Sequence, residues 1–218
     1  MNGQHPPTFK IMSNALIIYL HGFNSTGEGS DTVKGLRAIL PPDVDLIAPT
    51  YDGTNPKQTL NQILTLVRKE NKERWNDVVL VGTSLGGFWA ETISILEDVR
   101  VLIINPARHP SEALKKYMGE SKNFNTGETT VVTTDVLRAF KSFEGVRDHA
   151  IDDFKPTWPA EVLLWEGDEV LDSKKTAQEM ASSFHVTVMP GGRHRVKDYQ
   201  LVLDSAIKLL NNVSCSLD

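Results

Sequence analysis

A serine, an aspartate and a histidine occur in that order at positions 84, 168 and 194, each close to glycine. A serine hydroxyl becomes a strong nucleophile when a histidine takes its proton, and a carboxylate can orient that histidine and stabilise the imidazolium. Glycine lets the backbone turn sharply, so each side chain can stand at the end of a structural element. These residue types in this order indicate acyl transfer to a serine, provided that the fold brings them together.

The serine lies within Gly82-Thr83-Ser84-Leu85-Gly86, after a run of Val and Leu and before a helical pattern. Gly-x-Ser-x-Gly between a strand and a helix is the nucleophile elbow, a turn that raises the serine hydroxyl above a sheet. The helix start offers free N–H groups, and we expect the Leu85 amide to bind a developing oxyanion. The alternative is an ordinary turn in which Ser84 only caps the helix.

The segment His21-Gly22-Phe23-Asn24 follows the first apolar run. In hydrolases with this elbow such a segment supplies the second oxyanion donor, and we assign that role to the Phe23 amide. His21 precedes the serine, whereas the catalytic histidine comes last in this order, so we interpret His21 as structural. Asn24 is a candidate for substrate contact. A phosphate-binding loop is excluded because Glu28 occupies the position of its lysine.

Carboxylates crowd the segment after the fifth apolar run, where the acidic member of a triad belongs. Asp168 is the preferred candidate. Asp172 is the alternative, although it precedes a helical pattern and suits a helix cap. Glu166 and Glu169 are weaker candidates.

The histidine His194 follows two glycines and is flanked by Arg193 and Arg195. A flexible turn there could deliver the imidazole to the serine, and the alternative is a histidine on a surface loop. The guanidinium groups are candidates for holding an anionic part of a substrate, with solvated surface arginines as the alternative. His109 and His149 could line a pocket or be solvated.

Six apolar runs rich in Val, Ile and Leu alternate with helical patterns. Continuous runs predict strands buried on both faces of a parallel sheet, and the alternation predicts right-handed β-α-β crossovers. The expected strands are 15–20, 44–48, 78–81, 99–104, 161–165 and 185–189, and the expected helices are 31–40, 56–73, 84–96, 173–182 and 196–211. We number the six expected strands in chain order and expect them to lie in the order 2-1-3-4-5-6. The loops that carry the candidate residues then all begin at one edge of the sheet. The sequence therefore predicts an α/β-hydrolase fold with a mostly parallel, doubly wound sheet of about six strands.

Residues 107–158 interrupt the alternation and predict a short helical lid, holding an extended stretch at 128–134 and two short helical pieces. This lid is inserted into one domain at 15–218. Residues 1–14 are polar and are interpreted as a loose N-terminal leader without a secretory signal.

The composition argues against several other classes of protein. The chain of 218 residues has 23 Lys and Arg against 28 Asp and Glu, a net charge of −5, so it lacks the basic stripe of a nucleic-acid binder. No apolar run is long enough to span a membrane, and no metal or cofactor motif is visible, so we expect neither metal nor cofactor. The single cysteine, Cys215, and the lack of a signal favour the cytoplasm. The oligomeric state stays open.

Taken together, these motifs resemble the YqiA/YcfP-type bacterial esterases of the α/β-hydrolase superfamily, from about residue 16 to residue 210. The resemblance rests on segments 19–25, 82–87, 105–107, 125–127, 167–172 and 191–194. It implies a cytoplasmic carboxylic-ester hydrolase with the triad Ser84, Asp168 and His194. Arg193 and Arg195 depart from the neutral or apolar surroundings that the family gives its histidine.

The leading hypothesis is thus a serine esterase that cleaves a small-molecule ester through an acyl-enzyme. The closest alternative is an acyl-CoA or other thioesterase that uses the same triad. A catalytically silent binding protein on a hydrolase scaffold is an alternative of another class.

Overall fold

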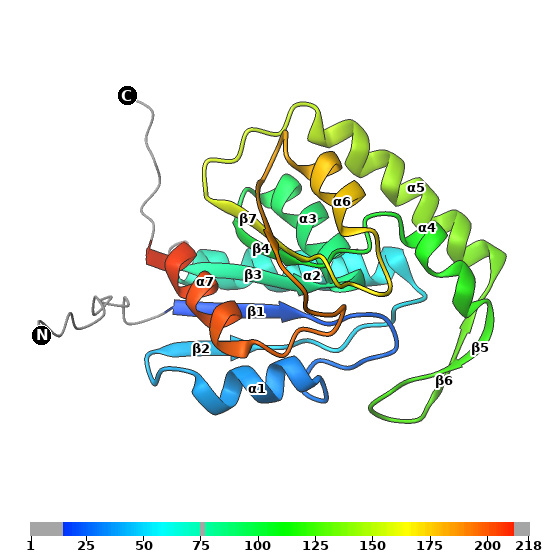
Figure 1. Cartoon of the computed structure of the whole chain (residues 1–218), viewed down its shortest axis with the longest axis horizontal. Coiled ribbons are helices and arrows are strands. Elements are labelled where there is room, and N and C mark those ends of the chain that lie inside the picture. Colours follow the sequence, from blue (N-terminus) through cyan, green and yellow to red (C-terminus); the bar gives the residue numbers. More distant parts are fainter. Residues whose placement is uncertain (1–14, 75–76, 212–218) are drawn as a thin grey trace, which may run out of the picture.

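A parallel sheet of six strands forms the centre of the structure, a computed structural model that describes residues 15–74 and 77–211. In chain order the elements are β1 Ala15–Leu20, α1 Asp31–Ile39, β2 Val44–Ile47, α2 Pro56–Glu73, β3 Val78–Thr83, α3 Leu85–Glu97, β4 Arg100–Ile104, α4 Pro110–Ala113, the 3-10 turn η1 Lys115–Tyr117, β5 Gly119–Lys122, β6 Thr129–Val132, α5 Thr134–Ile151, β7 Ala160–Trp165, α6 Ser173–Met180, β8 His185–Met189 and α7 Tyr199–Asn211. The strand order β2-β1-β3-β4-β7-β8 confirms the predicted doubly wound sheet (Figure 1). The expected leader at 1–14 and Cys215 lie outside the described residues.

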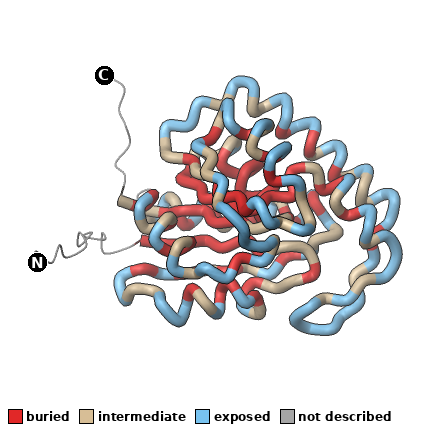
Figure 2. Tube along the Cα trace, in the orientation of Figure 1, coloured by how far each residue is buried: buried red, intermediate tan, exposed pale blue. Residues whose placement is uncertain are grey.

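Helices cover both faces of the sheet and form a three-layered molecule (Figure 1). Helices α1 and α7 enclose one hydrophobic core, whereas α2, α3, α5 and α6 enclose the other. Strands β1 and β4 are buried along their whole length, and Figure 2 shows the buried band through the centre. Burial on both faces explains why these strands read as continuous apolar runs. Within the described ranges, no helix combines the length and the apolar content needed to cross a membrane.

The last helix begins later than the sequence pattern predicted, at Tyr199 rather than at 196. Asp198 determines this start, because its carboxylate accepts the Leu201 amide at 3.0 Å and its carbonyl accepts the Val202 amide at 3.3 Å. This is the geometry of a helix N-cap. The residues between β8 and Asp198 therefore form a loop, and that loop carries His194.

The segment 107–158 contains more than the short lid that the sequence predicted. The two expected helical pieces are instead the short α4 and η1 and one long helix, α5, of 18 residues. Helix α5 packs against α2 and α3 and places Phe140 in the core. It therefore belongs to the helical layer, and the part that stands away from the sheet is the β5–β6 hairpin (Figure 1).

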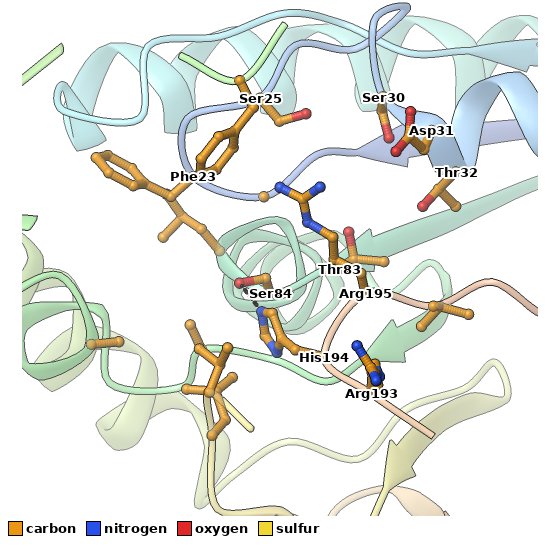
Figure 3. A pocket seen from close by; sticks show the side chains of 18 of the residues that line it. Phe23, Ser25, Ser30, Asp31, Thr32, Thr83, Ser84, Arg193, His194 and Arg195 are labelled. Carbon is orange, nitrogen blue, oxygen red and sulfur yellow. Dashed lines mark hydrogen bonds between the residues drawn. The ribbon is translucent and has the colours of Figure 1, made fainter. Parts of the chain in front are cut away.

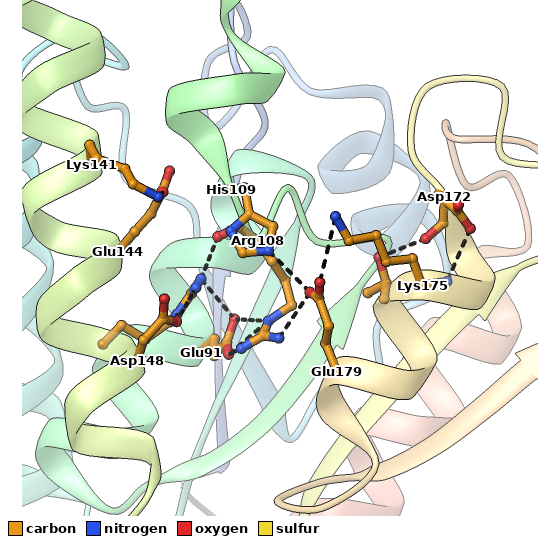
Figure 4. Close-up of polar contacts among 11 residues, drawn as sticks. Glu91, Arg108, His109, Lys141, Glu144, Asp148, Asp172, Lys175 and Glu179 are labelled. Carbon is orange, nitrogen blue, oxygen red and sulfur yellow. Dashed lines mark hydrogen bonds and ion pairs between the residues drawn. The ribbon is translucent and has the colours of Figure 1, made fainter.

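Buried charges fasten α5 to α3 (Figure 4). The side chains of Glu91, Glu144 and Arg147 are all 0% exposed. Glu91 lies 2.7 Å from the Arg108 guanidinium and 3.6 Å from that of Arg147. Glu144 accepts the amide of Ser111 at 2.7 Å. Charges can be buried at this depth because each has an opposite partner or a hydrogen bond.

Candidate active site

The loops that carry the candidate residues all leave the carboxyl edge of the sheet. Leu20 pairs with Gly82 across β1 and β3, and Trp165 pairs with Met189 across β7 and β8, so these strands end side by side. In open α/β sheets the crevice at this edge, where the strand order reverses, is the usual place for a ligand. Here the reversal lies between β1 and β3.

Ser84 occupies the turn between β3 and α3 with a φ of 56° and a ψ of −118°. A positive φ is uncommon for a residue with a side chain and is kept only where the surroundings enforce it. Here the Ser84 amide donates to the Ile104 carbonyl at 3.1 Å, and the Ser84 carbonyl accepts the amides of Gly87 and Ala107, each at 2.9 Å. These bonds hold the turn in place.

Two glycines allow this turn to form against the sheet. A Cβ atom at Gly86 would lie 2.0 Å from the Leu20 carbonyl oxygen, and one at Gly82 would lie 2.2 Å from the Gly86 carbonyl oxygen. No side chain fits at such distances, because the backbones themselves are in contact. The glycines on both sides of Ser84 are therefore required by close approach of α3 to β1 and β3.

The side chains of Ser84, His194 and Asp168 form one hydrogen-bonded line. His194 Nε2 lies 3.0 Å from Ser84 Oγ, and His194 Nδ1 lies 2.8 Å from Asp168 Oδ2. An ionised carboxylate only accepts, so Nδ1 carries the proton and Nε2 is left to accept from the serine hydroxyl. The structure thus brings together three residues that are 110 and 26 positions apart.

Asp168 is held rigidly by its own loop. Its Oδ1 accepts the amides of Val170 at 2.8 Å and Leu171 at 2.9 Å, and its side chain is 2% exposed. Burial alone would raise the pKa of this carboxyl, but the His194 hydrogen bond, the electrostatic attraction of His194 and the two amides together hold the pKa below its usual range. Asp168 is therefore a stable anion beside His194.

The alternative carboxylates have other partners. Asp172 accepts the Lys175 amide at 3.0 Å and so caps α6, the role that its place before a helical pattern suggested. Glu169 accepts the backbone amide of His194 at 3.1 Å, so it supports the loop rather than the imidazole.

Asn105, at the end of β4, is a residue whose role the sequence reasoning missed. Its amide nitrogen donates to the carbonyls of Arg193 at 3.3 Å and His194 at 3.2 Å, while its Oδ1 accepts the Trp165 amide at 3.1 Å. Asn105 thereby links the histidine loop to β4 and β7. A polar residue directly after a buried strand at the same sheet edge was the available signal.

His21 takes the structural position expected from its place in the sequence. It is 2% exposed and stacks on the Tyr51 ring with 4.0 Å between ring centroids. Its Nδ1 donates to the Gly22 carbonyl at 2.8 Å, and its Nε2 accepts the Tyr51 amide at 3.3 Å. Burial lowers the pKa of this imidazole from 6.5 to about 4, so His21 is neutral near pH 7.

The amides of Phe23 and Leu85 are available for a ligand. Among the described residues, neither amide donates a hydrogen bond. Both residues line the same cavity as Ser84, and Leu85 is the first residue of α3. Phe23 lies in the loop after β1. Free backbone amides that face one cavity, one of them at a helix start, can stabilise a negative oxygen.

A cavity of about 830 Å³ opens over Ser84 (Figure 3). Its walls come from the loops after β1, β3, β7 and β8, from the start of α1, and from the segment between α4 and the hairpin tip. Arg193 and Arg195 line it, whereas Asn24, His109 and His149 are not among its lining residues. Within the described part of the chain, no group of three or more His, Cys, Asp and Glu could hold a metal ion.

The tip of the β5–β6 hairpin, residues 123–128, is hydrogen-bonded to the loop after β1. Asn125 Oδ1 accepts the Thr26 amide at 2.9 Å, its Nδ2 donates to the Gly29 carbonyl at 2.7 Å, and the Phe124 amide donates to the Asn24 carbonyl at 2.7 Å. The Asn24 side chain donates to the Ser121 hydroxyl. Asn24 thus anchors the hairpin, and its amide group is turned to the hairpin and not to the cavity.

Comparison with known proteins places this sequence in a family. The uncharacterised protein family UPF0227 matches residues 16–211. The chain belongs to the UPF0227 family. One UPF0227 relative, the protein YcfP of Escherichia coli, is 30% identical over 184 residues, which cover 84% of this chain and 92% of YcfP.

Solved structures show the fold of this UPF0227 member to be that of the α/β-hydrolases. Est1E from Butyrivibrio proteoclasticus superposes with a TM-score of 0.68 at 18% identity, covering 89% of this chain and 86% of Est1E. The monoacylglycerol lipase of Paleococcus ferrophilus superposes with a TM-score of 0.67 at 9% identity, covering 92% of this chain and 96% of the lipase. The predicted fold class is therefore confirmed.

Proposed function

We propose that this protein is a serine esterase, which hydrolyses carboxylic esters through an acyl-enzyme intermediate. The observation that carries the proposal is the continuous line of hydrogen bonds from Ser84 Oγ through His194 to the buried carboxylate of Asp168. Two free amides and a large cavity adjoin this line. The lipase and esterase names of the proteins that share the fold agree with the same chemistry.

In the proposed reaction, Ser84 Oγ attacks the ester carbonyl carbon while His194 Nε2 takes the hydroxyl proton. The negative oxygen of the tetrahedral intermediate accepts hydrogen bonds from the Phe23 and Leu85 amides. His194 then gives its proton to the leaving alcohol oxygen, and the C–O bond to the alcohol breaks. Water attacks the acyl-enzyme with His194 as the base, which releases the acid and restores Ser84. Asp168 stabilises the imidazolium during both steps.

Hydrolysis of 4-nitrophenyl butyrate tests the proposal. Ser84→Ala is expected to lower kcat by about 10³-fold or more. The members of a triad act as a unit, so the loss of one of them removes most of the rate enhancement. Ser142→Ala, which removes the hydroxyl of an exposed serine on α5 that does not line the cavity, is the matched control and should keep most of the activity. Circular dichroism of each variant checks the fold. Activity of Ser84→Ala within tenfold of wild type contradicts the proposal.

A further inference from the structure

The charged residues that line the cavity are mostly cationic, although the whole chain is acidic. Lys116, Arg193, Arg195 and Lys197 line the cavity. The two carboxylates of the lining are Asp31 and Glu169, so four cations face two anions in a chain whose net charge is −5.

None of these four cations makes an ion pair with a described residue, whereas most other arginines pair with a carboxylate. The two carboxylates of the lining form no ion pair with these four cations. Glu169 accepts the His194 amide, and Asp31 is the first residue of α1, where the helix dipole favours a negative charge. The cavity therefore keeps an excess of unpaired positive charge.

Arg195 is positioned within this cavity by an aromatic ring. Its guanidinium carbon lies 4.9 Å from the centroid of the Phe124 ring, a cation–π contact. The Phe124 amide is in turn bonded to the Asn24 carbonyl, so the ring is tied to the loop after β1. Figure 3 shows the Arg195 guanidinium projecting into the cavity between Ser84 and the start of α1.

The polarity of the cavity lining differs on the two sides of Ser84. Phe23, Leu114 and Tyr117 contribute an apolar wall. The hydroxyls of Ser30 and Thr32 lie on the other side, where Figure 3 also places the arginines. In the proposed reaction His194 gives its proton to the leaving oxygen, so the alcohol part of an ester lies beside His194 and its two flanking arginines.

We propose that the enzyme prefers esters whose alcohol part carries an anionic group, a carboxylate or a phosphate, which Arg193 and Arg195 bind. This inference rests on the proposed esterase function. A guanidinium matches either anion with two parallel N–H donors. Because Arg193 and Arg195 are exposed, added salt should weaken this interaction. The apolar wall then receives the acyl part.

Three chromogenic esters with one acyl group and one nitrophenol core test the preference. They are 3-butanoyloxy-4-nitrobenzoic acid, the neutral 3-butanoyloxy-4-nitrobenzamide, and the phosphonic acid that replaces the carboxyl group. The wild-type kcat/KM is expected to be about tenfold or more higher for an anionic ester than for the amide. The two anionic esters separate a carboxylate preference from a phosphate preference.

The variant Arg193→Gln/Arg195→Gln should lower the ratio of anionic to neutral kcat/KM by about tenfold, and 0.5 M NaCl should lower the wild-type ratio. Both esters meet the same Ser84 and His194, so a change in triad reactivity cancels in the ratio. Lys57→Gln/Lys72→Gln, which removes the same charge from exposed positions of α2, is the control and should keep the ratio. Arg195→Gln alone serves if the double variant does not fold.

A wild-type ratio near one, or an unchanged ratio in the arginine variant, overturns the proposal. Hydrolysis of the neutral ester in that case still supports the esterase function. If the wild-type protein hydrolyses none of the three esters, the anionic preference and the esterase function fail together.

Discussion

Asp168 and Asp172 lie on the same loop, yet their carboxylates have different partners. Asp168 holds the imidazole of His194, whereas Asp172 caps α6. Sequence could rank these two residues because a carboxylate directly before a helical pattern suits a cap. The position of Asn105 after a buried strand was visible in the sequence, but its contacts to the His194 loop and to the end of β7 were not, because only the folded chain brings these segments together.

The two aspartates differ in their expected effect on the rate of ester hydrolysis. Asp168→Asn should lower kcat by about 10⁴-fold, because an amide in this place favours the wrong tautomer of His194. Asp172→Asn should change kcat by less than about threefold, since asparagine caps helices equally well. Steady-state kinetics of both variants on one ester gives the ranking. The reverse ranking would assign the orienting role to Asp172.

His21 should make the stability of the protein depend on pH. The pKa of its imidazole is about 4 in the folded state against an ordinary 6.5, so between these values the unfolded chain binds a proton that the folded chain does not. The contribution of His21 to the free energy of unfolding is therefore complete above pH 6.5. It falls by about 3 kcal/mol in total as the pH drops from 6.5 to 4.

Urea unfolding at several pH values, compared between wild type and His21→Gln, measures this contribution. The variant should lose less stability between pH 6.5 and 4. An NMR titration of the His21 ring in the wild-type protein checks the same value without any substitution. Titration near pH 6.5, or the same pH dependence in both proteins, would show that burial does not hold the imidazole neutral.

At the scale of elements, α5 shows where sequence patterns were insufficient. Its inward side carries Phe140, Glu144 and Arg147, which are buried at the spacing of one helix face. Two of these three side chains are charged, so the pattern resembled a solvated segment and predicted only short helical pieces. Their partners, Glu91 and the Ser111 amide, come from other elements and could not be read from local sequence.

Removal of one member of this buried network should destabilise the fold. Arg147→Met leaves part of the Glu91 charge uncompensated in the interior and should lower the free energy of unfolding by about 3 kcal/mol. Arg138→Met, in the same helix but with a side chain 75% exposed, should change it by less than about 0.5 kcal/mol. Urea unfolding of both variants measures the difference. Equal stabilities would contradict a stabilising role for the network.

At the scale of the whole molecule, the order of strands was predictable because the apolar runs were continuous and alternated with helical patterns. That order brought the loops with Ser84, Asp168 and His194 to one sheet edge. An inserted segment at 107–158 was predictable, but the part of the cavity wall that it forms through Phe124 and Asn125 was not. It depends on the hairpin tip bonding to the loop after β1, through side-chain and backbone contacts about 100 residues apart in sequence.

The central claim is that Ser84 is an activated nucleophile, and labelling with a fluorophosphonate tests it most directly. Such a probe forms a covalent bond with a serine whose proton is taken by a neighbouring base. We expect mass spectrometry of the digested wild-type protein to find the adduct on Ser84 alone, and we expect His194→Ala to abolish it. A wild-type protein that stays unlabelled, or that carries the adduct on another serine, would contradict the account.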